Sequence, residues 1–332
     1  MKNMEARFQS VFSAKLTAFI EEKQALGYRY IAAIKLLKDF DKTMAANNVA
    51  SDHLDERAVA LWIAKRSGEK GNNQLSRISS MRVFAEYLHR RGEGAFMCAY
   101  PHQKDIQVYQ PYIFDRFEVK RIFAAADAME YTSKSPRLHL TTPMITKTLY
   151  GTGMRISEVL KLKRKDVNLS QNCIMARDTK NGKERLLPIS GSLATVYEQY
   201  ISQQRFAPGD YLFTGKHGAV LDKENYYYAF RRLLEKAGIA HMGRGGGPRV
   251  HDFRHTFSVH RLNQWAREGK DMNAMLPILA VYLGHENVRI ASYYLRLTAQ
   301  VFPEMTAMVE RDFGEVIPDI LAKEREALHE YT

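Results

Sequence analysis

The sequence predicts a mainly α-helical protein with one small antiparallel β-sheet, divided into two domains. The chain has 332 residues, which is long for one average domain and suits two. Apolar residues recur at helical spacing along most of it, whereas strand-like segments are few, short and confined to the second half. With 45% hydrophobic residues, the chain has the composition of a compact globular protein.

The first 105 residues are predicted to form a four-helix domain. Helical periodicity runs through four successive segments, which are residues 10–28, 30–48, 51–68 and 74–92. Ser51 and Asp52 open the third segment as candidate helix caps. Two prolines and several polar residues then break the pattern, so residues 106–113 are expected to link this domain to the next.

The second domain is predicted to span residues 114–332 and to combine helices with a short hairpin. The segments "CIMARDT" and "ERLLPIS" are typical of strands, and the "KNGK" between them contains Asn-Gly, a strong signal for a tight turn. "YLFT", residues 211–214, is a candidate third strand. Helices are expected before the sheet, over residues 115–129, 138–153 and 155–167, and after it from residue 225, apart from the glycine-rich loop "GRGGGPR".

The net charge is +12 at pH 7, with an isoelectric point near 9.5. Residues 1–105 hold 17 Lys and Arg against 12 Asp and Glu, which is +5 and leaves +7 for the remainder, so both domains are basic. An excess of cations is the electrostatic footprint of a phosphate-binding surface, although a solvated basic surface has the same composition.

Other features of the composition exclude whole classes of protein. No apolar run approaches the roughly 20 residues that a membrane-spanning helix needs, and the N-terminus carries charges where a signal peptide is apolar. A cytoplasmic protein is therefore expected. Two cysteines, Cys98 and Cys173, are too few for a disulfide framework or a zinc ribbon, and we expect them to fill core space.

Polar groups that suit phosphate chemistry occur at several places in the second half. Arg155 follows a Gly-x-Gly turn in "GTGMRISE", where a helix N-terminus and a guanidinium can both bind a phosphate. Lys180 lies at the predicted hairpin tip in "TKNGKER". His251 and Arg254, in "VHDFRHTF", are three residues apart and so share one face of a helix.

The stretch "LGHENVRIASYY" adds His285 and two adjacent tyrosines, Tyr293 and Tyr294. Adjacent helical residues point about 100° apart, so only one of the two can face a given ligand. Core packing with a satisfied hydroxyl is the ordinary role of such a pair. On the residues alone, that role stays open beside a chemical one.

The spacing of His251 and His255 is also that of a zinc hydrolase. That motif requires a glutamate after the first histidine as general base. Here the residue is Asp252, and Arg254 is placed where it would repel a metal. A structural role for His255 is expected instead.

Six of these residues, in order along the chain, resemble the signature of the tyrosine recombinases, which include phage-type integrases and the Xer recombinases: Arg155, Lys180, His251, Arg254, His285 and Tyr294. The resemblance spans roughly residues 111–300. Residues 1–105 resemble the family's core-DNA-binding domain, a SAM-like bundle, in pattern only. The family's nucleophile lies nine residues after the Leu-Gly-His histidine, which implies Tyr294 and leaves Tyr293 a packing role.

The resemblance implies a DNA strand transferase that needs no metal, cofactor or ATP. Arg155 and Arg254 would hold the non-bridging phosphate oxygens, and His285 would donate a further hydrogen bond. His251 would accept the tyrosine proton, and Lys180 would protonate the departing 5′ oxygen. The product would be a 3′-phosphotyrosine link, which keeps the bond energy for rejoining.

The implied partner is double-stranded DNA with an inverted-repeat core site, in the cytoplasm at the nucleoid. A helix over about residues 316–330 would be exchanged between protomers of a tetramer, and its alternative is a helix folded onto its own domain. Integration, excision, dimer resolution and inversion all stay open, as does a need for accessory factors or partner recombinases. Phosphate-backbone contacts are expected from six basic residues: Lys161, Lys163, Arg164, Lys165, Arg77 and Arg82.

Two other functions share parts of this pattern. A type IB topoisomerase-like enzyme would use the same chemistry, but the small helical N-terminal domain and the C-terminal helix favour a recombinase. A catalytically inert DNA-binding protein would not need all six residues. Glu158, three residues after Arg155, is either an orienting partner for that guanidinium or a plain surface acid.

Overall fold

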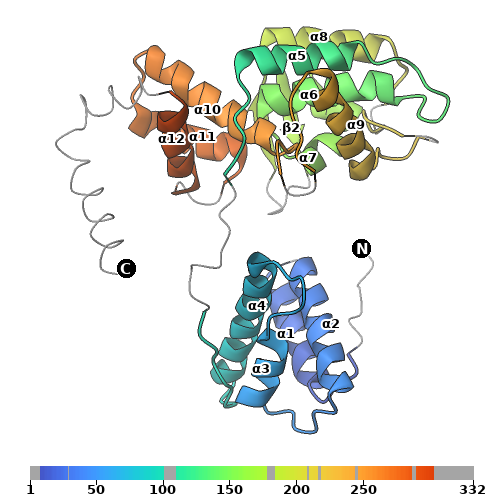
Figure 1. Cartoon of the computed structure of the whole chain (residues 1–332). Helices are drawn as coiled ribbons and strands as arrows, with labels where there is room; N and C mark the ends of the chain where they lie inside the picture. The colour runs from blue at the N-terminus through green and yellow to red at the C-terminus, as the bar shows by residue number, and fades with distance from the viewer. Residues whose placement is uncertain are drawn as a thin grey trace. The chain divides into compact units, whose positions relative to one another are not determined.

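The computed structural model describes residues 8–302 apart from residues 29, 101–109, 178–183, 208, 216–217, 244–245 and 286–288 (Figure 1). The chain divides into two compact units, residues 1–109 and residues 110–332. Both are mainly helical, and the second also contains a small antiparallel sheet. The predicted fold class is therefore confirmed. Within the described residues, no helix is long and apolar enough to cross a membrane.

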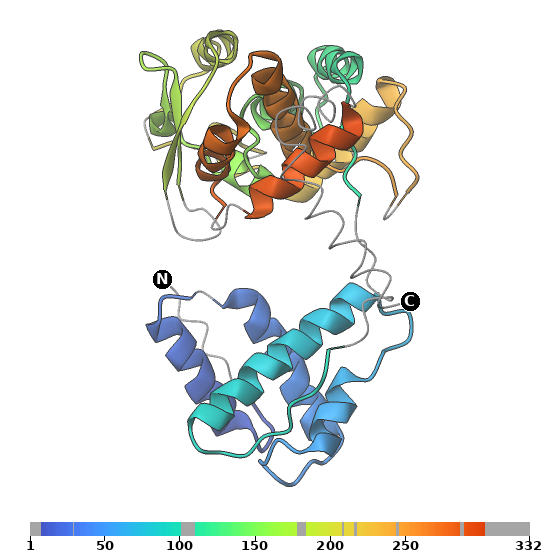
Figure 2. The same cartoon turned by 90° about the vertical axis from the view of Figure 1, so that its left-hand side faces the viewer.

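The first unit consists of four helices packed around one core, as Figures 1 and 2 show: α1 (Ser13–Ala25), α2 (Ile31–Ala46), α3 (Glu56–Ile63) and α4 (Gly71–Arg90). The Phe40 ring packs against those of Trp62 and Phe84 at its centre. Asp55 caps α3 by accepting the Ala58 N–H at 2.7 Å. The prediction that Ser51 or Asp52 caps this helix is therefore wrong.

Arg77 lies inside this core rather than on a DNA-facing surface. Its side chain is 3% exposed and forms an ion pair with Glu69, and its guanidinium lies over the Trp62 ring. It also donates to the backbone carbonyls of Trp62 and Ala64. Because these groups hold the guanidinium out of solvent, the structure contradicts the predicted phosphate contact at Arg77.

Replacing Arg77 with methionine is expected to destabilise the first unit by about 3 kcal/mol, because the Glu69 carboxylate would stay buried without its counter-charge. Arg66 also stacks on Trp62, but its ion pair with Asp39 is exposed. Arg66→Met should therefore cost less than about 1 kcal/mol. Urea unfolding followed by tryptophan fluorescence compares the two variants, and equal losses would contradict the role assigned to Arg77.

The sheet of the second unit has three antiparallel strands in the order β1-β2-β3: β1 (Val167–Asn168), β2 (Cys173–Ala176) and β3 (Arg185–Pro188). The predicted hairpin strands pair as expected, with Ile174 opposite Leu187. Residues 211–214 are not the third strand. Leu212 and Phe213 are fully buried in the core, and this segment forms only single bridges, to Lys163 and Val220.

Eight helices complete the described part of this unit: α5 (Arg116–Asp127), α6 (Leu138–Thr152), α7 (Ile156–Leu160), α8 (Gly191–Ser202), α9 (Lys223–Lys236), α10 (Asp252–Arg267), α11 (Met272–Leu283) and α12 (Arg289–Val301).

The helix predicted over residues 155–167 is shorter than expected. The Asp166 carboxylate accepts the Lys163 N–H at 2.9 Å and supports a 3₁₀ turn, η2 (Arg164–Asp166), in place of a longer α-helix.

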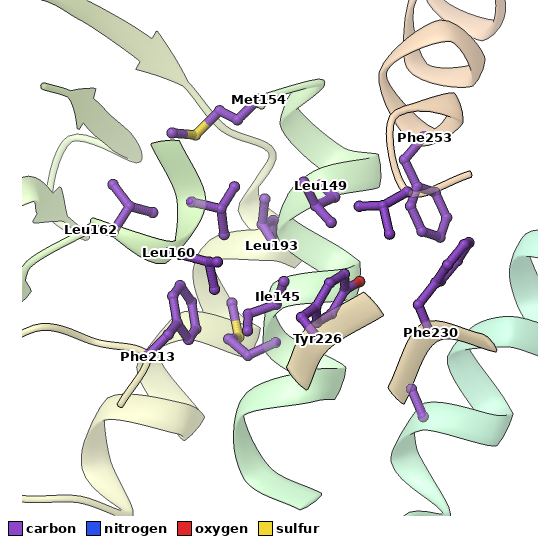
Figure 3. Close-up of a cluster of buried hydrophobic side chains, with 14 of the residues drawn as sticks. Ile145, Leu149, Met154, Leu160, Leu162, Leu193, Phe213, Tyr226, Phe230 and Phe253 are labelled. Carbon is purple, nitrogen blue, oxygen red and sulfur yellow. The ribbon is translucent and has the colours of Figure 1, made fainter. Parts of the chain in front are cut away.

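Helix α6 runs through the centre of the unit, where it contacts α5, α8, α9 and α10. Figure 3 shows Ile145 and Leu149 of α6 among Leu193 of α8, Phe230 of α9 and Phe253 of α10, all buried. The opposite side of α10 contacts α11 and α12 around a second core. Helix α10 therefore lies between two packed groups of helices, whose ends carry the residues of the site.

Candidate active site

Arg254, on the first turn of α10, is the most buried charge of the site, with 2% of its surface exposed. Its Nη1 donates to the Gly153 carbonyl at 3.0 Å, just after α6. Its Nη2 donates to the Leu283 carbonyl and to His285 Nε2, both at 2.7 Å, where α11 ends. Burial lowers the pKa of Arg254 to about 10, opposed by the hydrogen bond that the guanidinium donates to the Tyr294 oxygen, so the guanidinium stays charged at neutral pH.

The contact with Arg254 fixes the tautomer of His285. A guanidinium only donates, so Nε2 accepts and the ring proton lies on Nδ1. Among the described residues, Nδ1 of His285 has no hydrogen-bond partner. It is therefore a buried donor without an acceptor.

Arg155 enters the same site from the turn between α6 and α7. Gly153 adopts φ +61°, and a Cβ there would lie 2.6 Å from the Phe257 ring, which explains the glycine of the "GTG" turn. The Arg155 N–H and Nη1 both donate to the Glu158 carboxylate, at 3.0 and 2.9 Å. Glu158 is 3% exposed, so it orients Arg155 and is not a plain surface acid.

Glu158 also binds Arg185, which sequence reasoning did not single out. Burial alone would raise the pKa of Glu158, but hydrogen bonds and charge from Arg185 and Arg155 outweigh it and hold that pKa below its ordinary value. Glu158 is therefore an anion between two guanidinium groups. Its distant partner leaves no local signal, because Arg185 lies 27 residues further along the chain.

Four aromatic rings gather beside these charges. The His255 ring lies 5.1 Å from that of His251 and 5.6 Å from that of Tyr294, between ring centroids. The Tyr294 ring stacks on that of His285 at 5.8 Å. Tyr294 is 2% exposed, whereas Tyr293 is half-buried. The structure thus places Tyr294, rather than its neighbour, against Arg254 and His285.

His251 immediately precedes α10, and the residue is exposed. Desolvation by the surrounding protein and then the charges of Arg254 and Arg155 lower the pKa of His251 to about 4. The same causes lower the pKa of His285 to about 4. Desolvation, followed by the charges of His251 and Arg254, lowers the pKa of His255 to about 3. All three imidazoles are therefore neutral at pH 7.

These shifts predict an acid-sensitive fold. Below the ordinary histidine value of 6.5 the unfolded chain takes up protons, whereas the folded chain takes them up only near pH 4, so the free energy of unfolding falls as pH drops through this interval. Urea titrations at pH 6.5 and 5 measure the slope. His255→Gln should reduce it, and an unchanged slope would contradict the neutral state of His255.

The other residues predicted from the sequence are Lys180 and the basic residues expected to contact DNA. Lys180 lies outside the described residues. Lys161 and Lys165 are exposed; Lys163 lies over the Tyr211 ring at 5.1 Å, and Arg164 donates to the Val167 carbonyl at 3.1 Å. In the first unit, Arg82 lies over the Tyr100 ring at 4.5 Å and donates to the Cys98 carbonyl.

Comparison with known proteins places this site in a family. The model of the phage integrase family matches residues 113–300. A putative integrase/recombinase, y4rB, of Sinorhizobium fredii is 28% identical over 91% of this chain and 98% of its own length. The tyrosine recombinase XerA of Thermococcus kodakarensis is 30% identical over 62% of this chain and 66% of its own.

Solved structures share the fold. A XerH site-specific recombinase bound to difH substrate aligns with a TM-score of 0.60 and 18% identity, over 84% of this chain and 80% of that one. The Tn1549 transposon integrase in complex with circular intermediate DNA aligns with a TM-score of 0.61 and 17% identity, over 83% and 93%. The family match covers more than half of the chain and contains the whole described site, so this protein belongs to the phage integrase family of tyrosine recombinases.

Proposed function

We propose that the protein cleaves and rejoins DNA at specific sites through a 3′-phosphotyrosine intermediate, with Tyr294 as nucleophile. The observation that supports this most directly is the convergence on Arg254, because one guanidinium donates to His285 Nε2 and to the Tyr294 hydroxyl oxygen. Arg155 lies close enough to lower the pKa of both His251 and His285. Two guanidiniums, a phenol and neutral imidazoles form a donor and acceptor set that suits in-line phosphoryl transfer.

In the proposed reaction, the Tyr294 oxygen attacks the scissile phosphorus and the bond to the 5′ oxygen breaks. Arg155 and Arg254 hold the non-bridging oxygens as negative charge builds in the transition state. Nδ1 of His285 donates a further hydrogen bond. His251 accepts the phenolic proton, and Lys180 supplies the proton that the departing 5′ oxygen takes up. Attack by a 5′ hydroxyl of another strand reverses each transfer without external energy.

DNA is the proposed substrate because relatives act on it and this chain is basic. The aligned Tn1549 integrase is in complex with circular intermediate DNA, and the aligned XerH recombinase is bound to difH substrate. The net charge of +12 here suits a duplex clamped by phosphate contacts. Lys161 and Lys165, both exposed in the second unit, are proposed as such contacts, at an inverted-repeat core site in the nucleoid.

The proposed function is tested by incubating the protein with nicked duplexes in EDTA. The nicked duplexes are drawn from the DNA that flanks its gene, and a denaturing gel detects a protein–DNA adduct. An adduct, followed by exchange between two labelled duplexes, supports the proposal. Relaxation of supercoiled DNA without exchange would identify a topoisomerase-like enzyme instead, and binding without an adduct would identify an inert DNA-binding protein.

Assembly is proposed to depend on the C-terminal segment. The helix predicted over about residues 316–330 lies outside the described residues, and its apolar residues at helical spacing suit docking on a neighbouring protomer. Truncation at Gly314 is expected to leave binding of a single duplex intact and to abolish tetramers on paired duplexes. Native gels and light scattering measure both, and tetramers formed by the truncated chain would exclude helix exchange.

A further inference from the structure

Arg185, at the start of β3, joins two segments of the site that are far apart in the sequence. Its side chain is 11% exposed. Nη1 and Nη2 donate to the two oxygens of Glu158, at 3.2 and 2.8 Å, and Nε donates to the Tyr282 carbonyl at 2.9 Å. The Arg185 guanidinium therefore binds both the first turn of α7 and the last turn of α11.

The contact with Glu158 reaches Arg155 directly. Oε1 of Glu158 accepts Nη1 of both arginines, and Oε2 accepts the Arg155 N–H and Nη2 of Arg185. Each carboxylate oxygen thus holds one donor from either side. Without Arg185, Arg155 alone among the described residues would hold the Glu158 carboxylate, and the Arg155 side chain would lose its link to β3.

The contact with Tyr282 fixes the turn that carries His285. Arg185 and Arg254 bind consecutive carbonyls, those of Tyr282 and Leu283. The next residue, Gly284, has φ +69°, and a Cβ there would lie 3.1 Å from Nη1 of Arg185, so the turn lies directly against the guanidinium. The Tyr282 hydroxyl also donates to the Pro188 carbonyl of β3 at 3.1 Å. The strand therefore anchors the end of α11 at two points.

We propose that Arg185 is a positioning residue that holds Arg155 and the His285 turn at the spacing required to bind one phosphate. This inference rests on the function proposed above. Arg185 is assigned no contact with the phosphate: all three of its nitrogens donate to protein groups, and its side chain is 11% exposed. An arginine is needed because a lysine offers a single point of donation and cannot bridge the carboxylate and the carbonyl.

The test compares Arg185→Met and Arg185→Lys with wild type and with Arg137→Met. Arg137 is a half-buried arginine of the same unit that donates to Gln204. Single-turnover cleavage of saturating nicked duplex is expected to slow by about 10- to 100-fold in Arg185→Met, because small misplacements of binding groups cost that much. Arg185→Lys should be intermediate. Dissociation constants for intact duplex and melting of Arg185→Lys should stay close to wild type.

A second substrate identifies the path through which Arg185 acts. Replacing the bridging 5′ oxygen with sulfur gives a leaving group that needs no proton, but the non-bridging oxygens still need their clamp. Arg185→Met should slow cleavage of both substrates by the same factor. A loss confined to the oxygen substrate would overturn the proposal, because Arg185 would then act on proton delivery.

Other outcomes are equally decisive. Wild-type rates in both Arg185 variants, or weaker binding with unchanged cleavage, would overturn the positioning role and leave the proposed function standing. Absence of an adduct from wild type and from Arg137→Met would overturn the proposed function, and this inference with it.

Discussion

Tyr294→Phe is expected to abolish the covalent DNA adduct, whereas Tyr293→Phe is expected to retain it. The Tyr294 ring stacks on His285 and is 2% exposed, and phenylalanine preserves that packing while removing only the hydroxyl that Arg254 binds. Tyr293 presents its ring to His255 at 6.3 Å and is half-buried. Its substitution removes a hydroxyl that the proposed reaction does not use.

The two variants serve as matched controls for each other, because each loses one hydroxyl from neighbouring positions of α12. Adducts are counted on denaturing gels after incubation with nicked duplex in EDTA, and circular dichroism checks folding. An adduct that survives in Tyr294→Phe and disappears in Tyr293→Phe would reverse the assignment of the nucleophile.

Arg254→Lys is expected to slow cleavage by about 100- to 1,000-fold, the effect of removing one donor from a preorganised oxyanion site. The guanidinium binds the Gly153 and Leu283 carbonyls and His285 at once, so it also holds together the ends of α6 and α11. A lysine keeps the charge but offers one point of donation in place of a planar fork. Binding of duplex DNA should change far less than the cleavage rate.

Arg261→Lys on the same helix is the control for this substitution. Arg261 donates to Gln264 on the surface of α10 and touches none of the converging groups. Single-turnover cleavage rates and thermal melting are measured for both variants. A rate within about threefold of wild type in Arg254→Lys would show that this guanidinium does not stabilise the transition state.

Sequence patterns predicted the parts of the fold that depend on local interactions. Helical periodicity predicted the helices of both units except α8, and Asn-Gly between strand-like segments predicted the β2–β3 pairing. Strand β1 has only two residues, too few for any periodic pattern. Helix α7 ends early because the Asp166 side chain competes for a backbone N–H, a contact that residue spacing does not reveal.

The position of Arg77 in the helical pattern itself indicates burial. It precedes Met81 by four residues and Phe84 by seven, so it lies on the buried stripe of α4. A charge in the middle of an apolar stripe is more consistent with a paired, buried group than with a DNA contact. Its partner Glu69 lies only eight residues earlier in the chain.

The order of residue types along the chain predicted the convergence at Arg254, because each of these residues has a recognisable local context. Arg185 has none. Its contacts reach Glu158 and Tyr282, 27 and 97 residues away, and they exist only once β3 packs against α7 and α11. Contacts between residues so far apart in the sequence can be identified only once the folded structure is known.

The most direct test of the account is to locate the covalent bond. After adduct formation and nuclease digestion, trypsin should release residues 290–296, "IASYYLR", with a nucleotide attached, and fragmentation should separate the two tyrosines. A nucleotide on Tyr294 is the predicted result. A nucleotide on Tyr293, or on any residue outside this peptide, would contradict the assignment of the nucleophile and the mechanism built on it.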